Sequence, residues 1–356
     1  MTAATPATTR GRRPMRDPLN LTGARLPRWA PVASFVVALM LTAALFAVTP
    51  MQGVAEAVVV TVVLFVAVQT AWSFTVEGRR RAVDRFFTTL VHGAFLLALL
   101  PLISITFTVL TKGSGVVNAD FLTHSLRNIG PKDTGGGIYH GIIGTLEQAA
   151  ITSVISIPVA LLVAVYLVEY GRGRLARTVT FFVDVMTGIP SIVAGLFIFT
   201  VWVLLLGFHR AGFPAALALS ILMIPTVVRS TEEMLKLVPH ELREASLALG
   251  VPKWRTVLRI VIPTALPGIV TGVMLGIARV IGETAPLLLL VGATDSINPD
   301  PMNGPQTALP MIIFDQASRP QSTAVARAWG AALVLIVIVM LLNLTARMVA
   351  RFTRVR

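Results

Sequence analysis

The stretch "ELREASLALGVPKWRTVLRIVIP" (241–263) is a long polar interruption between two apolar segments. It predicts two short helices separated by a turn. Pro239 suits the first helical turn, and Glu241 and Glu244 favour the positive N-terminal end of the helix dipole. Gly250 can adopt the left-handed conformation that ends a helix. The second helix then leads into the apolar segment that follows.

The first of these two helices carries an apolar stripe. Leu242, Ala245 and Leu249 recur at three- and four-residue spacing, so they share one face. A helix of this length is too short to be stable alone in water. We therefore expect this face to be buried against another protein.

Apolar segments of membrane-spanning length dominate the rest of the chain. Of its 356 residues, 55% are hydrophobic and 13% are charged, whereas soluble domains carry about 25% charged residues. Because one crossing needs about 20 apolar residues, the sequence predicts eight transmembrane helices. They fall at 31–49, 54–76, 86–111, 138–168, 176–206, 212–228, 264–292 and 325–349. The expected fold class is an all-α polytopic membrane protein.

The positive charge of the chain predicts its orientation. The formal net charge is +13. Lysine and arginine are concentrated in segments 1–30, 77–85, 169–175, 229–263 and 350–356. Since positive residues accumulate on the cytoplasmic side of membrane proteins, we expect both termini to be cytoplasmic. Membrane topology accounts for the excess of basic residues, and we expect membrane lipid around the chain but no nucleic-acid partner.

Catalytic and metal-binding residue patterns are not apparent. The chain has no cysteine, and its five histidines are scattered without a nearby carboxylate cluster. A catalytic site needs a nucleophile, a base or metal ligands grouped together. We therefore expect no metal, no cofactor and no catalytic residue in this chain.

The interrupting stretch matches a known pattern. Its residues resemble the E-A-A, x3, G, x9, I-x-L-P signature of the membrane subunits of bacterial ABC importers. The matching positions are Glu244, Ala245, Ser246, Gly250, Ile260, Ile262 and Pro263. Ser246 and Ile262 depart conservatively from the signature. The resemblance implies that this stretch is a coupling helix that docks on an ATPase, and the chain has no G-x-x-x-x-G-K-[ST] motif, so that ATPase must be a separate polypeptide.

Flanking blocks narrow the resemblance. "TGIPSIVAGLF" (187–197), "RSTEEMLKLVPHELREASLALG" (229–250), "GIARVIGETAPLL" (276–288) and "LPMIIF" (309–314) resemble the A-type permease subunit of the phosphate-specific ABC transporter. The resemblance covers 136–349 well, 86–135 weakly and 1–85 not at all. The block at 276–288 favours phosphate over molybdate, sulfate or other solutes.

The resemblance implies a type I ABC importer (MetI-like) fold in a bacterial cell membrane. This chain and a homologous C-type permease would form the pathway for phosphate. An ATPase dimer, which binds ATP and Mg, would lie below the pore, and a phosphate-binding protein would dock outside.

The chain divides accordingly. Residues 1–30 form a basic cytoplasmic tail that we expect to be disordered, and 31–85 form an additional transmembrane hairpin. Residues 86–349 form the permease domain, with its coupling loop at 229–263, and 350–356 form a second basic tail.

Polar and charged residues inside the spans predict the substrate pathway. In the fifth span, Pro190 and Gly188 interrupt the helix, which is either a simple kink for packing or non-helical backbone beside a watery cavity. In the seventh span, Arg279 and Glu283 each cost roughly 2.5–3.5 kcal/mol to insert. We expect the pathway to be lined by Arg279, Glu283, Asp184, Thr187 and Ser191.

Three glycines of the seventh span predict which way its charges face. Gly268, Gly272 and Gly276 form a small-residue ridge for close helix packing. If the helix stays regular through Glu283, both charges lie on the glycine face and avoid lipid. Arg279 then offers its guanidinium to phosphate. The structural alternative is an internal ion pair that locks the span, helped by Asp184.

Other functions stay open at this point. The nearest alternative is an ABC permease for another oxyanion or small solute. A secondary transporter would also have broken helices, but usually shows inverted repeats, and none is evident. An intramembrane enzyme would need clustered catalytic groups that the sequence does not show.

Overall fold

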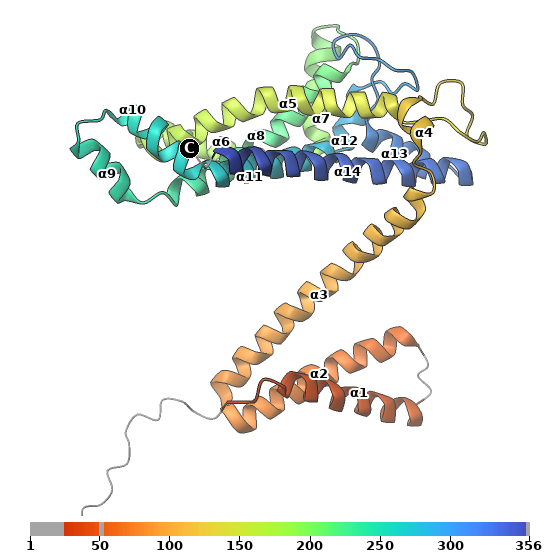
Figure 1. Ribbon diagram of the computed structural model, residues 1–356, viewed down its shortest axis with the longest axis vertical. Helices are drawn as coiled ribbons and strands as arrows, with labels where there is room; N and C mark the ends of the chain where they lie inside the picture. Colours follow the sequence, from red (N-terminus) through yellow and green to blue (C-terminus); the bar gives the residue numbers. More distant parts are fainter. Residues whose placement is uncertain (1–24, 50–52, 354–356) are drawn as a thin grey trace, which may run out of the picture. The chain divides into compact units, whose positions relative to one another are not determined.

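The computed structural model describes residues 25–49 and 53–353, with side chains to residue 348, and every regular element in these ranges is helical (Figure 1). The expected basic tails at 1–30 and 350–356 therefore lie largely outside the described residues.

The α-helices are α1 (Ala30–Val48), α2 (Val54–Glu77), α3 (Arg79–Ser114), α4 (Ala119–Thr123), α5 (Tyr139–Val165), α6 (Gly173–Thr187), α7 (Ser191–Phe199), α8 (Gly212–Lys236), α9 (His240–Ala248), α10 (Lys253–Thr256), α11 (Ile262–Ile281), α12 (Ala285–Leu290), α13 (Leu309–Ala317) and α14 (Ser322–Thr353). Three π-helical turns, η1 (Tyr166–Tyr170), η2 (Thr200–Leu205) and η3 (Val257–Val261), extend α5 and α7 and precede α11.

Seven of the described helices are long and apolar enough to cross a membrane. Taken together, Gly173–Thr187 and Ser191–Leu205 are also long and apolar enough to cross a membrane as one bent span. This brings the total to as many as eight spans among the described residues. The all-helical, eight-span fold class predicted from the sequence is confirmed.

The chain forms two compact units, divided within α3 between Ser104 and Ile105. In the first unit α1 and α2 pack as a hairpin. The Thr61 hydroxyl donates to the Thr42 hydroxyl at 3.0 Å, which satisfies two polar groups between apolar faces. Near the other end of α2, Arg85 donates to the Glu77 carboxylate at 2.5 Å. The hairpin is thus held by ordinary helix packing and a few polar contacts.

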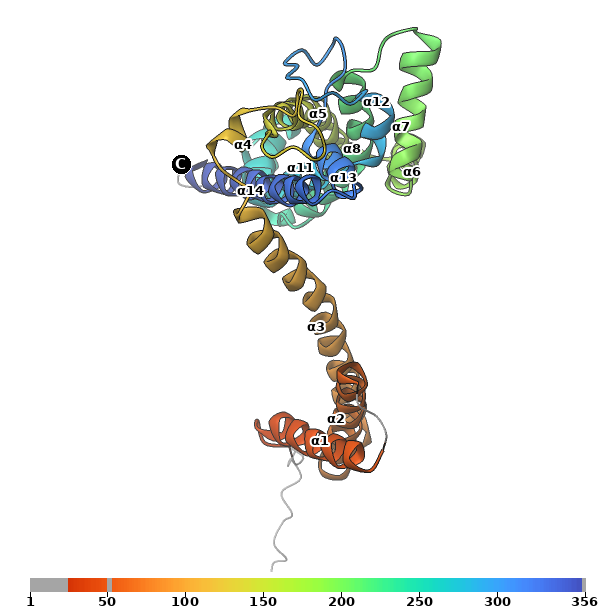
Figure 2. The ribbon, with the colours of Figure 1, turned by 90° about the vertical axis from the view of Figure 1, so that its right-hand side faces the viewer.

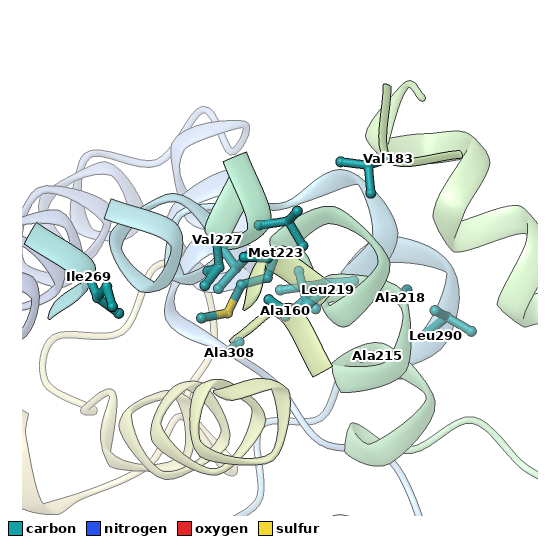
Figure 3. Close-up of a cluster of buried hydrophobic side chains, with 14 of the residues drawn as sticks. Ala160, Val183, Ala215, Ala218, Leu219, Met223, Val227, Ile269, Leu290 and Ala308 are labelled. Atoms are coloured by element: carbon teal, nitrogen blue, oxygen red, sulfur yellow. The ribbon is translucent and has the colours of Figure 1, made fainter. Parts of the chain in front are cut away.

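The second unit is a helical bundle built around α8, which packs against both α5 and α11, while α14 packs against α11 and α13 (Figures 1 and 2). Its core is rich in alanine. Ala160, Ala215 and Ala218 are fully buried around Leu219 and Met223 (Figure 3). Alanine side chains let helix backbones approach closely, which is how helices associate within a membrane.

The fifth predicted span is broken. Helices α6 and α7 meet at an angle of 103° around Gly188–Pro190, which is much more than a simple kink. Proline lacks the amide hydrogen that a continuous helix needs, and here it caps the N-terminus of α7. The sequence left two interpretations of Pro190 and Gly188 open, a simple kink and interrupted backbone, and the structure has interrupted backbone. The seventh predicted span is broken as well, because α11 ends at Ile281 and α12 begins at Ala285.

A buried glutamine fixes the loop between α12 and α13. Gln306 is 1% exposed, and its amide donates to the Glu147 carboxylate at 2.5 Å and accepts from Gln148 at 3.1 Å. Both partners lie on α5. Because a buried amide without partners is costly, these bonds hold the loop against the end of the bundle that lies away from α9 and α10.

Candidate functional site

The glycine ridge of α11 packs directly on α8. A Cβ atom added at Gly272 would clash with the Ser230 side chain, and one at Gly276 would lie 2.9 Å from the Val227 side chain. A Cβ at Gly268 would clash in the same way with Met234. Since real Cβ atoms do not approach so closely, only glycine permits this distance between the two helices. The ridge thereby fixes where the end of α11 lies along α8.

Arg279 lies one turn beyond this ridge, in the last turn of α11, with its side chain 51% exposed. Its guanidinium makes two long contacts. It lies 3.5 Å from the Thr226 hydroxyl on α8 and 4.0 Å from the Glu283 carboxylate. Arginine has five N–H donors, so these two contacts leave most of its donor capacity unused within the described part of the chain.

Glu283 is not on the same helix as Arg279. Helix α11 ends at Ile281, with Gly282 as its C-cap. The condition that the helix stays regular through Glu283 is therefore not met, because Pro286 lies in the first turn of a separate helix, α12. The carboxylate still returns toward Arg279 and is 21% exposed. At 4.0 Å the pair is too long for a strong hydrogen bond, so it does not lock the span.

The position of Arg279 along the bundle limits the environments that its side chain can contact. Thr226 lies near the middle of α8, about three turns before its last residue, Lys236. A half-exposed arginine at this depth faces either water or another protein chain, because exposure to lipid is strongly unfavourable. Arg279 therefore marks the surface of the bundle that does not contact lipid.

The two helix breaks lie on neighbouring elements. Helix α7 packs against α12, and a Cβ at Gly195 would lie 2.8 Å from the Pro286 Cα atom. Backbone that leaves helical geometry inside a membrane must be buried in protein or line a watery cavity. Thr187 and Ser191 flank the first break; Thr187 is exposed with its hydroxyl bonded to the Val183 carbonyl, and Ser191 is half-buried.

Asp184 does not contact Arg279, as it would in an ion-pair cluster that locks the seventh span. Its carboxylate accepts from Arg229 on α8, not from Arg279. Arg229 also donates to Glu232 at 2.6 Å, and Glu232 is 2.9 Å from Lys236. These charges form a chain of ion pairs from α6 along the last turns of α8. The structure thus groups Arg279 with Glu283 and Thr226, and places Asp184 in a second group nearer the end of α8.

The helix-turn-helix at 240–256 is held by a buried pair of hydroxyls. Ser246 is 4% exposed, and its hydroxyl lies 2.8 Å from that of Thr256 on α10. Gly250 has a φ angle of +77°, and nothing lies within 4 Å of the site of an added Cβ atom. Glycine is therefore favoured there by the left-handed backbone conformation, and lack of space plays no part. Glu244 and Ala245 are exposed, Ile260 lies in the π-helical turn η3, and Pro263 lies in the first turn of α11.

The apolar stripe of α9 is uncovered. Leu242 is 42% exposed and Leu249 is 84% exposed, with Ala245 between them also at the surface. The opposite side of α9 is fixed to the bundle, because Arg243 donates to Glu169 at 2.8 Å and to the Leu235 carbonyl at 2.9 Å. One face of α9 therefore holds the bundle while the other presents apolar side chains.

Three of these positions were missed by sequence reasoning. The sequence analysis counted Arg229 only as one of the basic residues of the cytoplasmic loop. It assigned no role to Glu169 or Thr256. The "RSTEE" run (229–233) does signal a charged helix end, but its pairing with Asp184 needs the fold. Among the described residues no group of three or more His, Asp or Glu side chains is placed to hold a metal ion.

Comparison with known proteins places these features in context. Residues 156–355 match the family described as "Binding-protein-dependent transport system inner membrane component". The chain is 50% identical over 279 residues to "Phosphate transport system permease protein PstA 1" of Mycobacterium tuberculosis (strain CDC 1551 / Oshkosh), covering 78% of this chain and 91% of the relative. It is 38% identical to "Phosphate transport system permease protein PstA" of Pasteurella multocida (strain Pm70), covering 75% and 94%.

Solved structures share the fold. A chain of a bacterial alginate ABC transporter, solved in complex with its alginate-bound periplasmic protein, superposes with a TM-score of 0.55 at 14% identity. The match covers 76% of this chain and 96% of the other. At this identity the likeness concerns the arrangement of helices alone.

Proposed function

Because this chain belongs to the family of PstA phosphate transport permeases, within the binding-protein-dependent inner membrane transport components, we propose that it forms one half of a transmembrane pathway for inorganic phosphate. A homologous C-type permease supplies the other half. The pathway opens alternately to the two sides of the membrane, driven by ATP binding and hydrolysis on a separate ATPase.

One observation supports the assignment of the pathway: the half-exposed guanidinium of Arg279 lies beside the break between α11 and α12, against Thr226 near the middle of α8. Its contacts to Thr226 and Glu283 are long, so its donors are available to an anion. Phosphate oxygens match the planar fork of an arginine. Glu283 steadies the arginine and repels the anion, so that phosphate binds transiently and leaves.

The rest of the pathway surface follows from the first break. Thr187 and Ser191 flank Gly188–Pro190, and Asp184 lies one turn before Thr187. Hydroxyl groups can donate to phosphate oxygens. We place these residues along the pathway on the partner-facing side of α6 and α7.

Energy coupling is proposed for α9. Its exposed apolar stripe, Leu242, Ala245 and Leu249, fits a groove on the ATPase, and Glu244 lies exposed in the middle of the helix. Gly250 and the Ser246–Thr256 contact fix the angle between α9 and α10. Because α10 continues through η3, with Ile260, into α11 at Pro263, a displacement of α9 is transmitted to the helix that bears Arg279.

The proposed assembly has four kinds of component. They are this chain, the C-type permease, an ATPase dimer that binds ATP and Mg, and an extracytoplasmic phosphate-binding protein. This chain itself is proposed to be non-catalytic and to bind no cofactor. The α9 end of the bundle and both termini lie in the cytoplasm, as the positive-inside rule indicates.

The test is Arg279→Gln in the assembled transporter. We expect phosphate uptake to fall at least tenfold while the complex still assembles and hydrolyses ATP. Arg319→Gln, which removes an exposed arginine paired with Asp315, is the matched control and should transport normally. Normal uptake in Arg279→Gln, or failure to assemble, would contradict the proposal. Competition of uptake by sulfate and molybdate tests the alternative oxyanions, and phosphate should be the strongest competitor.

A further inference from the structure

A basic pocket lies beneath α9, apart from the pathway around Arg279. It has a volume of about 490 Å³ and is bordered by the end of α5 with η1, the loop that follows, the end of α8, and the starts of α9 and α10. Its charged lining residues are Arg172, Lys236, His240, Arg243, Lys253 and Glu169. Four of them are permanent cations and one is a carboxylate.

The single carboxylate in the lining is already used. Glu169 accepts from Arg243 at 2.8 Å, and its side chain is 6% exposed. Arg243 is further fixed by the Val238 carbonyl at 2.6 Å. This arginine is therefore held in place and neutralised, and it forms a wall of the pocket.

The other cations retain free donors. Lys253 donates to the Glu169 carbonyl and lies 4.9 Å from the centre of the Tyr170 ring, so no carboxylate neutralises it. Lys236 is paired with Glu232 and Glu233 on its own helix. Arg172 is exposed, and among the described residues no hydrogen bond or ion pair of its guanidinium is found. The pocket thus carries uncompensated positive charge from Arg172 and Lys253.

The apolar stripe and the pocket occupy opposite sides of α9. At about 100° per residue, His240 and Arg243 lie on one side of the helix, and Leu242, Ala245 and Leu249 lie on the other. A protein that contacts only the apolar stripe therefore does not contact the residues that line the pocket. The acidic residues of α9, Glu241 and Glu244, fall between the two faces and are exposed.

We propose that this pocket binds a phosphate-type anion at the cytoplasmic surface of the membrane. Arginine and lysine side chains that line the same concave site are the usual partners of phosphate oxygens. A bound phosphate group would connect Arg172, in the loop after α5, to Lys253, at the start of α10. Occupancy then ties the helix-turn-helix at 240–256 to α5 and limits its movement relative to the bundle.

The same chemistry can come from inorganic phosphate or from an anionic lipid headgroup, so the test has two arms. In the first arm, the complex is placed in nanodiscs of neutral phosphatidylcholine and titrated with radiolabelled inorganic phosphate, in an Arg279→Gln background that removes the pathway arginine. In the second arm, the complex is exchanged into nanodiscs containing phosphatidylglycerol, and retained lipid is counted by native mass spectrometry after detergent extraction.

The variants differ only in where charge is removed. Arg172→Gln with Lys253→Gln removes two cations of the pocket. Arg174→Gln with Arg255→Gln is the control, since these exposed arginines lie two residues further on in the same segments and do not line the pocket. Each pair lowers the net charge equally, so non-specific attraction of anions changes by the same amount.

We expect the pocket variant to lose at least tenfold in affinity or retention, and the control pair to stay within twofold of the parent. A loss in the first arm identifies inorganic phosphate as the ligand, and a loss in the second identifies a lipid headgroup. Equal behaviour of both variant pairs in both arms overturns the proposal. Crosslinking of Lys253 to a carboxylate of the ATPase in the assembled complex also overturns it, because the pocket would then be a protein contact.

Discussion

The guanidinium of Arg229, on α8, is ion-paired with the carboxylate of Asp184, on α6. Asp184 lies one turn before the break at Gly188–Pro190, and its side chain is 61% exposed while that of Arg229 is 33% exposed. Exposed ion pairs contribute about 0.2–1 kcal/mol to stability. The pair is therefore a weak contact between a broken helix and α8, and weak contacts at such positions can open and close during transport.

Asp184→Asn should separate folding from transport. We expect the thermal stability of the complex to fall by no more than about 1 kcal/mol, because the pair is exposed. Phosphate uptake should fall several-fold, since Arg229 then keeps only its bond to Glu232 and can use its other donors to hold the anion on its way to the cytoplasm. Uptake of radiolabelled phosphate and thermal unfolding of the purified complex measure the two effects.

The double variant Asp184→Asn with Arg229→Gln is the control. If Arg229 retards phosphate once Asp184 no longer pairs with it, removing Arg229 restores part of the uptake that Asp184→Asn loses. A double variant that transports no better than Asp184→Asn would show that the carboxylate acts in some other way.

Gly272→Ala should destabilise the bundle. The added methyl group would meet the Ser230 side chain on α8, and overpacking of this kind costs about 1–3 kcal/mol. Gly93→Ala is the matched control, because nothing lies within 4 Å of the site of its Cβ; alanine in a helix is favoured over glycine by about 0.5–1 kcal/mol. Thermal unfolding should therefore shift in opposite directions. Ser230→Gly combined with Gly272→Ala should regain part of the loss, and no recovery would argue against a direct clash.

The sequence predicts the spans well because hydropathy and the length of a crossing depend on local composition. Six of the predicted spans coincide with single apolar helices, the fifth coincides with the bent pair α6–α7, and the seventh covers α11 and α12 with the break between them. The left-handed conformation of Gly250 also follows from local rules, since a glycine after a short helix is the usual end signal. The MetI-like fold follows from the resemblance and is confirmed by the family match.

Contacts between distant residues could not be predicted. Ser246 looks like a conservative replacement for alanine, but its hydroxyl bonds to Thr256, a contact that depends on the angle between two helices. The end of α11 at Ile281, before Glu283, was not predicted either. Pro286 disrupts helix geometry, but whether the chain bends slightly or begins a new helix depends on packing of α12 against α7.

Gly250→Leu should uncouple transport from ATP hydrolysis. A side chain at φ of +77° is strained by roughly 1–2 kcal/mol, which changes the angle between α9 and α10. Gly250→Asn is a control of similar size, because asparagine adopts the left-handed conformation more readily. We expect lost uptake and weak co-purification of the ATPase with Gly250→Leu, and largely normal behaviour with Gly250→Asn. Equal loss in both variants would mean that size matters at this position and backbone conformation does not.

Single-cysteine labelling should establish the orientation of the bundle, and the chain suits it because it has no native cysteine. Asn303 and Ser114 are exposed at the end opposite α9, whereas Ala248 and Arg174 are exposed at the α9 end. Ser246 is buried and would label poorly. Cysteines at Asn303 and Ser114 should react with a membrane-impermeant maleimide in intact cells, and those at Ala248 and Arg174 only after permeabilisation. Two sites at each end guard against shielding by a partner, and labelling of Arg174→Cys in intact cells would reverse the assigned orientation.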